Sequence, residues 1–155
     1  MSRIDYYDDP AAPTANSLVP AVSAVVRDER GRVLLQRRRD NDLWALPGGA
    51  MEIGESVGQA VAREVEEEAG YLVEPVYVIG VYSDPRHVFA YDDGEVRQEF
   101  SVCVAAEVRS GRLRVSDEST EVGWFTPDEA ADLEMHPRIR VRLTDGLAGV
   151  RAAVA

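Results

Sequence analysis

The chain of 155 residues has little cysteine and no long hydrophobic run, and each shortage excludes a class of protein. Its single cysteine, Cys103, cannot form an internal disulfide, which favours a reducing compartment. No stretch approaches the roughly 18 apolar residues that a membrane-spanning helix requires. The first ten residues also lack the apolar segment of a signal peptide. We therefore expect a cytoplasmic protein that does not enter a membrane.

Basic side chains are also in the minority. The chain has 28 acidic and 17 basic residues, which gives a formal net charge of −11. A polymeric nucleic acid is bound through a basic surface, so this balance argues against DNA or RNA as the partner. A single nucleotide stays compatible with the charge if metal ions mediate the contact with its phosphates. We expect a small-molecule partner.

The strongest local pattern in the chain is that of one amphipathic helix. Ser56 and Gln59 have the spacing of a capping box, and Gly70 suits the left-handed residue that follows a helix. These signals predict a helix from about 57 to 69. At 100° per residue its apolar positions share an arc of about 80°. They are Val61, Val65 and Ala69.

Three carboxylates of this helix are expected beside the apolar arc. Glu64, Glu67 and Glu68 stand at positions i, i+3 and i+4 and share an arc of about 100°. A solvated acidic face explains Glu66, which points away, but it does not explain three acids at the margin of a core. Like charges at these spacings repel each other. A cluster of hard oxygen ligands is what Mg²⁺ or Mn²⁺ requires, and a bound cation would relieve the repulsion.

Residues 49–71 resemble the signature of the Nudix hydrolases. Gly49 is followed after five residues by Glu55, and seven more residues lead to the run Arg63-Glu64-Val65-Glu66-Glu67-Glu68-Ala69-Gly70-Tyr71. All charged and glycine positions of this signature are present at the expected spacing. Only Tyr71 departs from it, because the family usually has an aliphatic residue there. Residues 44–49 are similar to the segment that precedes the signature in the family.

The resemblance implies roles for the signature residues. Glu64, Glu67 and Glu68 match the metal-binding positions of the family, and the backbone carbonyl of Gly49 is a further candidate ligand. A glycine suits this position because it lets the backbone approach an ion closely. Arg63 is expected to hold the carboxylates through charge-assisted hydrogen bonds. Glu64, Glu67 and Arg63 are therefore catalytic candidates.

Two further acids have alternative readings. Members of the family often take the general base, or an extra metal ligand, from a loop outside the signature. Glu118, in the acidic loop 116–121, is our candidate for this catalytic role, and a solvated turn residue is the competing interpretation. Glu55 either interacts with the N-terminus of the helix or joins the metal ligands.

Candidate substrate-binding residues lie outside the signature. They are Arg37, Tyr82, Arg86 and Phe89. Arg37 lies near the end of a predicted strand and would reach a phosphate, although a surface ion pair is the competing interpretation. The other three border the polar stretch 83–98, where they would contact the base.

The pattern along the chain predicts an N-terminal arm, residues 1–18, followed by a single domain, residues 19–155. We expect the arm to be mobile or loosely packed, with Tyr6 and Tyr7 anchored on the domain or on the second subunit of a homodimer. Strands are predicted at 19–27, 32–38, 73–82, 100–108, 111–115 and 122–125, and a long loop at 83–98. A further helix is predicted after Thr126. After His136 the pattern fits a strand or a helix, and the resemblance favours a helix. The resemblance implies an α/β/α sandwich with a mixed β-sheet.

The resemblance also implies a divalent-metal-dependent pyrophosphohydrolase that cleaves a nucleoside diphosphate linked to another group. Two substrate classes stay open. Pro85 resembles a proline that follows the signature in ADP-ribose hydrolases, whereas the short chain suits MutT-like hydrolases of nucleoside triphosphates, including oxidised ones. The alternative of another class is an inactive Nudix fold that senses nucleotides, which the retained signature acids disfavour. Cys103, in an apolar strand, argues against an isomerase of the same fold, which needs a catalytic thiol.

Overall fold

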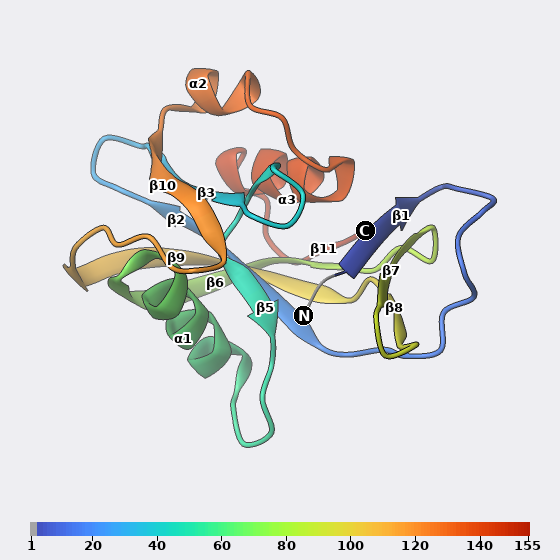
Figure 1. Ribbon diagram of the computed structural model, residues 1–155. Coiled ribbons are helices and arrows are strands. Elements are labelled where there is room, and N and C mark those ends of the chain that lie inside the picture. Colours follow the sequence, from blue (N-terminus) through green and yellow to red (C-terminus); the bar gives the residue numbers. More distant parts are fainter. Residues whose placement is uncertain (1–2) are drawn as a thin grey trace.

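A computed structural model describes residues 3–155 of the chain, which fold around one large mixed sheet (Figure 1). Its strands in spatial order are β10 (Ser119–Phe125), β3 (Val33–Arg38), β2 (Ala21–Arg27), β9 (Ser101–Gly111), β6 (Tyr71–Tyr82) and β11 (Ala153–Val154). Two short strands join it at the side, β4 (Trp44–Ala45) on β3 and β5 (Gly48–Ala50) on β2. The pair β2–β9 and the pair β11–β6 are parallel, and the other pairs are antiparallel.

Helices cover both faces of this sheet (Figure 1). The helix α1 (Val57–Ala69) packs on one face, and α2 (Pro127–Ala131) and α3 (Pro137–Leu147) lie on the other. Each face has its own buried cluster, with Val61 of α1 in the first and Leu143 of α3 in the second. The predicted α/β/α sandwich with a mixed sheet is confirmed. Within residues 3–155, no helix is both long enough and apolar enough to cross a bilayer.

The predicted ends of α1 are those of the structure. The Ser56 hydroxyl accepts a hydrogen bond from the Gln59 N–H at 3.1 Å, and the Gln59 side chain accepts one from the Ser56 N–H at 2.9 Å. Gly70 has φ of 86° and ends the helix in the left-handed conformation. A Cβ atom at Gly70 would lie 2.3 Å from the Arg112 carbonyl oxygen, so the position needs glycine.

A second, smaller sheet corrects two expectations. It consists of β1 (Arg3–Tyr7), β7 (His87–Tyr91) and β8 (Val96–Gln98), in the order β1-β7-β8. The prediction that the stretch 83–98 is a long loop is wrong, because its turn residues connect the two strands of a hairpin. Gly94, with φ of 90°, lies in that turn. Residues 3–7 are not loosely packed, since they pair with β7 along their whole length.

The strand predicted at 111–115 is also wrong. Gly111 has φ of 96° and ends β9, after which the chain leaves the sheet. The Arg114 N–H then donates to the Ala69 carbonyl oxygen at 2.9 Å, and the Arg114 guanidinium donates to the Glu66 carbonyl oxygen at 2.9 Å. The segment therefore satisfies free carbonyl groups at the end of α1. The last helix, α3, is confirmed, with the His136 side chain as its N-cap.

Candidate functional site

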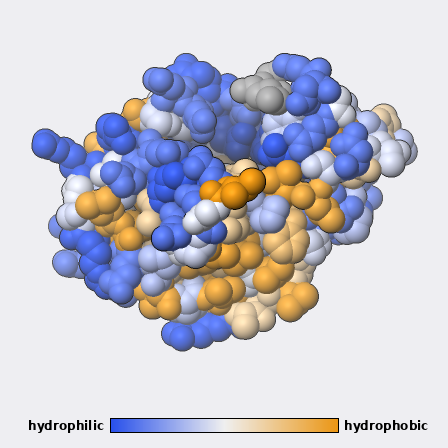
Figure 2. All heavy atoms as spheres, turned by 90° about the horizontal axis from the view of Figure 1, so that it is seen from below, coloured by the Kyte–Doolittle hydropathy of each residue, from blue (hydrophilic) through white to orange (hydrophobic). Residues whose placement is uncertain are grey.

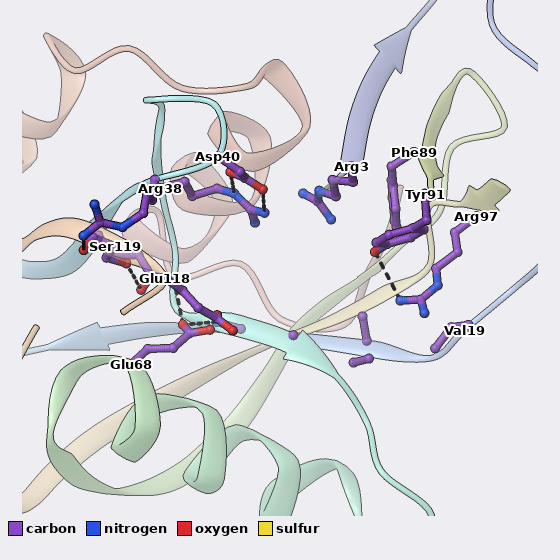
Figure 3. A pocket seen from close by; sticks show the side chains of 16 residues that line it. Arg3, Val19, Arg38, Asp40, Glu68, Phe89, Tyr91, Arg97, Glu118 and Ser119 are labelled. Carbon is purple, nitrogen blue, oxygen red and sulfur yellow. Dashed lines mark hydrogen bonds and ion pairs between the residues drawn. The ribbon is translucent and has the colours of Figure 1, made fainter. Parts of the chain in front are cut away.

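A cavity of about 500 Å³ opens between the large and the small sheet. Its lining residues are Arg3, Val19, Ala21, Gln36, Arg38, Arg39, Asp40, Gly48, Gly49, Ala50, Glu68, Phe89, Tyr91, Arg97, Glu118 and Ser119. Figure 3 shows Glu68 and Glu118 at one end and Arg3, Phe89 and Tyr91 across from them. Figure 2, a view from below, shows a hollow on this face of the molecule with hydrophilic residues at its sides and hydrophobic residues along its lower edge.

Glu68 of α1 is fixed at the wall of the cavity by strands β3 and β5. Its side chain is buried, and its Oε2 atom accepts hydrogen bonds from the Gln36 side chain at 2.7 Å and from the Gly48 N–H at 3.0 Å. The Ser119 hydroxyl of β10 in turn donates to the side-chain oxygen Oε1 of Gln36 at 3.0 Å. Three strands of the sheet therefore position one carboxylate (Figure 3).

Glu64, one turn earlier on α1, lies directly against β5. It is also buried, with 8% of its surface exposed. A Cβ atom at Gly49 would lie 2.5 Å from its Oε1 atom, so the missing side chain at Gly49 leaves the room that this carboxylate occupies. The backbone of β5 and two carboxylates of α1 meet at this point.

Burial and mutual repulsion disturb the ionisation of both acids. Burial raises the pKa of Glu64, against hydrogen bonds with Glu68 and Arg63 that lower it. Burial and the charge of Glu64 raise the pKa of Glu68 well above its ordinary value, although the Gly48 N–H and Gln36 oppose this shift. A divalent cation bound between the two carboxylates would relieve this repulsion, and oxygen ligands are those that Mg²⁺ prefers. The residues present therefore fit such an ion.

Arg63 connects the acids of α1 with the loop before it. Its guanidinium donates to the Glu55 carboxylate at 2.6 and 2.9 Å and to Glu64 Oε1 at 2.9 Å. It also donates to the Ala50 carbonyl oxygen at 3.1 Å. The Glu55 carboxylate accepts a further bond from the Glu52 N–H at 2.8 Å. In the described structure Glu55 is a partner of Arg63 and stabilises the loop, and it does not line the cavity.

Glu67 differs from its two companions. Its side chain is 60% exposed, and its Oε2 atom lies 3.3 Å from the Arg63 guanidinium. The expectation that three acids crowd against the core therefore holds for Glu64 and Glu68 only. Glu66 is exposed, as expected for a residue on the solvated face. Neither Glu64 nor Glu67 lines the cavity, so Glu68 is the acid of α1 that faces it.

Glu118 lies in the loop before β10 and lines the cavity on the same side as Glu68 (Figure 3). Its backbone carbonyl accepts a hydrogen bond from the Arg39 N–H at 3.0 Å. The Arg39 guanidinium also donates to the Asp117 carbonyl oxygen at 3.0 Å. Arg39 therefore fixes the loop, while the exposed side chain of Glu118 stays next to the cavity.

Of the four candidate substrate-binding residues, the structure brings only Phe89 to the cavity. Arg37 forms surface ion pairs with Asp42 at 2.8 Å and Glu121 at 3.3 Å. Tyr82 is fully buried in the core on the other face of the sheet, where its hydroxyl donates to a carboxylate of α3 at 2.7 Å. Arg86 is bound to the carboxylate of residue 84 at 2.9 Å, away from the cavity.

The small sheet contributes lining residues that sequence reasoning missed. The Arg3 guanidinium lies 4.6 Å from the centre of the Phe89 ring, and the Arg97 guanidinium lies 4.6 Å from that of Tyr91. Phe89 and Tyr91 are two residues apart on one strand and therefore point to the same face. That spacing is a signal in the sequence, but it has a meaning only once β7 is known to be a strand.

Comparisons with known proteins identify the family of the chain. A family model described as NUDIX domain matches residues 17–145. A "MutT-like protein" of Streptomyces ambofaciens is 39% identical over 129 residues, which are 83% of this chain and 77% of that protein. An "ADP-ribose pyrophosphatase" of Methanocaldococcus jannaschii is 32% identical over 108 residues, 68% of this chain and 60% of that protein.

Solved structures show the same fold. A NUDIX hydrolase from Nitrosomonas europaea superposes with a TM-score of 0.71 at 25% identity, over 90% of this chain and 78% of that one. A MutT NUDIX hydrolase from Burkholderia pseudomallei superposes with a TM-score of 0.68 at 28% identity, over 84% of this chain and 98% of that one.

Proposed function

Because this chain belongs to the NUDIX hydrolase family, we propose that it is a metal-dependent pyrophosphohydrolase. Its reaction is cleavage of the phosphoanhydride of a nucleoside diphosphate that is linked to another group. The observation that supports this most directly is the buried pair of carboxylates, Glu64 and Glu68, which meets the backbone of Gly48 and Gly49 at the edge of a cavity. Two buried like charges at a solvent-accessible site are unfavourable unless a cation binds there.

We assign the binding of Mg²⁺, or of Mn²⁺, to Glu64, Glu67, Glu68 and the backbone carbonyl of Gly49. The carboxylates supply hard oxygen ligands, and the absence of a side chain at Gly49 lets the backbone come close. When bound, the ion neutralises the charge of the phosphate oxygens and lowers the pKa of a water molecule. Arg63 acts as a positioning residue, because it orients Glu64 and fastens it to the loop before α1.

Proton transfer is assigned to an exposed acid near the cavity. Glu67 is accessible to water at the end of α1, and Glu118 faces the cavity from the loop before β10. A carboxylate in such a position accepts the proton of the attacking water as a general base. Glu118 is our choice for this role, whereas Glu67, which does not line the cavity, stays assigned to the metal ion.

The opposite end of the cavity suits the nucleoside part of the substrate. The rings of Phe89 and Tyr91 offer apolar surface, and Arg3 and Arg97 place positive charge beside them. Both open substrate classes fit this combination. Relatives bear names from both classes, "ADP-ribose pyrophosphatase" in Methanocaldococcus jannaschii and "Putative 8-oxo-dGTP diphosphatase" in Bacillus subtilis, the latter 44% identical over 62 residues.

The remaining parts of the proposal follow from charge and cysteine content. With a net charge of −11, the partner is a small nucleotide and not a polymeric nucleic acid. The one cysteine, Cys103, is buried and free, in keeping with the cytoplasm as compartment. The homodimer stays a prediction.

A substrate panel tests the proposed function. Purified protein is incubated with nucleoside triphosphates, oxidised triphosphates and ADP-ribose, with Mg²⁺, with Mn²⁺ and with excess chelator, and both phosphate and nucleoside monophosphate are measured. We expect hydrolysis of at least one class that disappears in chelator and in Glu68→Gln, while Glu66→Gln retains it. Binding of nucleotides without any hydrolysis would contradict the proposal and support the sensing module instead.

A further inference from the structure

A second group of potential metal ligands lies away from α1. It combines Asp5 of β1, His87 of β7 and His136, the residue before α3. One ligand atom from each lies within 4.8 Å of the other two. Asp5 and His136 are partly buried and His87 is buried. Three segments that are far apart in the sequence meet at this cluster.

His87 has an unused nitrogen inside the cluster. Its side chain is 6% exposed, and its Nδ1 atom lies 3.1 Å from Glu99 Oε1. Its Nε2 atom is buried and has no hydrogen-bond partner among the described residues. Asp5 Oδ2 is 3.6 Å from Nε2, which is longer than a hydrogen bond. When Nδ1–H donates to Glu99, the lone pair of Nε2 faces the carboxylate of Asp5, whose other oxygen lies 3.1 Å from the Arg3 guanidinium, and a proton or a metal ion between Nε2 and Oδ2 would relieve this contact.

Glu99 is held in the charged form. The Arg138 guanidinium donates to it at 2.8 Å, and the Arg142 guanidinium at 3.1 Å. A fixed carboxylate on one nitrogen of a histidine orients the other nitrogen, as it does behind many metal-ligating histidines.

We propose that Asp5, His87 and His136 bind one transition-metal ion, best represented by Zn²⁺, at a site separate from the acids of α1. Two imidazoles and a carboxylate suit Zn²⁺, whereas Mg²⁺ prefers oxygen ligands only. Ligand atoms about 2.0–2.1 Å from a tetrahedral ion lie about 3.3 Å apart. The His87–Asp5 separation of 3.6 Å is close to this spacing.

His136 requires a rearrangement on binding. Its Nδ1 atom now accepts a hydrogen bond from the Arg138 N–H at 3.1 Å, and its ring stacks on that of His87 with centroids 4.2 Å apart. To bind an ion, His136 would either release the hydrogen bond from Arg138 and use the Nδ1 lone pair, or turn its ring to present Nε2. Asp5 and His87 therefore form the basis of the site, and His136 completes it.

The site would fasten the wall of the substrate cavity. Asp5 lies on β1 two residues after Arg3, and His87 lies on β7 two residues before Phe89. Both Arg3 and Phe89 line the cavity. An ion that joins β1, β7 and the start of α3 would hold this wall in place without touching the reacting phosphates.

Binding of Co²⁺, a visible-light probe for Zn²⁺ sites, tests the proposal. The metal-free full-length chain is titrated with Co²⁺ in millimolar Mg²⁺, which occupies the acids of α1. We expect one Co²⁺ per chain, with absorption bands typical of nitrogen ligands and displaced by Zn²⁺. Asp5→Asn should weaken binding at least about 10-fold, and Asp8→Asn, an exposed residue of the same segment, should leave it unchanged.

Two further variants make the result decisive. His87→Gln should abolish the bands; if it does not fold, Asp5→Asn decides alone, because it replaces one oxygen atom by a nitrogen group of the same size. Glu68→Gln should retain the Co²⁺ bands, since the site does not include α1. The proposal is overturned if the wild type binds no Co²⁺ in the presence of Mg²⁺, or if Asp5→Asn binds as the wild type does. The first result would mean that a proton, shared by His87 and Asp5, is the cation of this cluster, and the second would mean that Co²⁺ binds elsewhere on the chain.

Discussion

Two neighbouring glycines let the backbone of β5 lie against the carboxylates of α1. A Cβ atom at Gly48 would lie 2.2 Å from the Val22 carbonyl oxygen, and one at Gly49 would lie 2.5 Å from Glu64 Oε1. Both distances are far below ordinary contact, so neither position tolerates a side chain without movement. The close approach is also what presents the Gly48 N–H to Glu68.

Gly49→Ala tests this requirement. The new methyl group has to displace the Glu64 carboxylate, so we expect turnover with Mg²⁺ to fall by a factor on the order of 10². Gly58→Ala in α1 is the matched control, because its Cβ atom meets only Pro75 Cγ at an ordinary 3.6 Å. The control should retain activity and gain up to about 1 kcal/mol of stability from the helix. Equal activity of the two variants would show that Glu64 need not lie against β5.

Glu67→Gln tests the exposed acid of the signature. If Glu67 is a ligand of the ion that places the attacking water, its loss should lower turnover by a factor on the order of 10³ or more. The far-ultraviolet circular dichroism should not change, since the side chain is 60% exposed. Glu66→Gln, also exposed but on the solvated face, serves as control and should be nearly silent. A Glu67→Gln variant that keeps more than a tenth of wild-type turnover would remove Glu67 from the mechanism.

Glu118 and Glu121 allow a matched comparison within one segment. Glu118 lines the cavity, whereas Glu121 pairs with Arg37 at the surface. Glu118→Gln should therefore lower turnover more than Glu121→Gln does. It should also remove the acidic limb of the pH–rate profile, because that limb reports protonation of the general base. An unchanged acidic limb would exclude Glu118 as the base.

At the scale of elements, local signals decide what the sequence predicts well. Both ends of α1 follow from a capping box and a glycine, which act within a few residues. The small sheet does not follow from local signals, because β1 pairs with a strand eighty or more residues away in the sequence. The turn that joins β7 to β8 also lies in a stretch that the sequence predicts as a loop. Glu64, Glu68 and Gly49 were therefore predicted together, whereas Arg3 and Arg97 could not be assigned to the same cavity.

The acids of α1 also give the stability of the metal-free protein a defined pH dependence. The folded pKa of Glu68 lies above the unfolded value of about 4.3, so folding favours its protonated form. This contribution is fully present below the unfolded pKa and is lost as the pH rises through the folded pKa. In excess chelator, as the pH rises from the unfolded pKa to the folded pKa of Glu68, we expect the melting temperature of the wild type to fall more than that of Glu68→Gln. If the melting temperatures of the two proteins fall in parallel as the pH rises, ionisation of Glu68 does not destabilise the folded state.

At the scale of the whole molecule, two sheets enclose one cavity with opposite chemistry at its ends. The large sheet and α1 supply carboxylates together with Arg38 and Arg39, and the small sheet supplies aromatic rings with Arg3 and Arg97 beside them (Figure 3). All 17 basic residues of the chain are arginines, and of those beside the cavity Arg3 and Arg97 stack on rings, Arg38 pairs with Asp40, and Arg39 donates to backbone carbonyl oxygens. The acidic end therefore depends on an added cation if it is to hold a phosphate.

The dependence on a cation at Glu64 and Glu68 is the central claim, and thermal unfolding with and without Mg²⁺ tests it most directly. Cβ atoms one helical turn apart are about 5–6 Å from each other, and two charges at that spacing and an effective dielectric near 20 repel by roughly 3 kcal/mol, of which about 1 kcal/mol is expected to remain after screening and the bonds from Arg63. Wild type and Glu68→Gln are melted in excess chelator and in millimolar Mg²⁺. In chelator we expect the melting temperature of Glu68→Gln to equal or exceed that of the wild type. Mg²⁺ should raise the melting temperature of the wild type more than that of the variant. A wild type that Mg²⁺ does not stabilise, or a variant that melts well below it in chelator, would contradict the account.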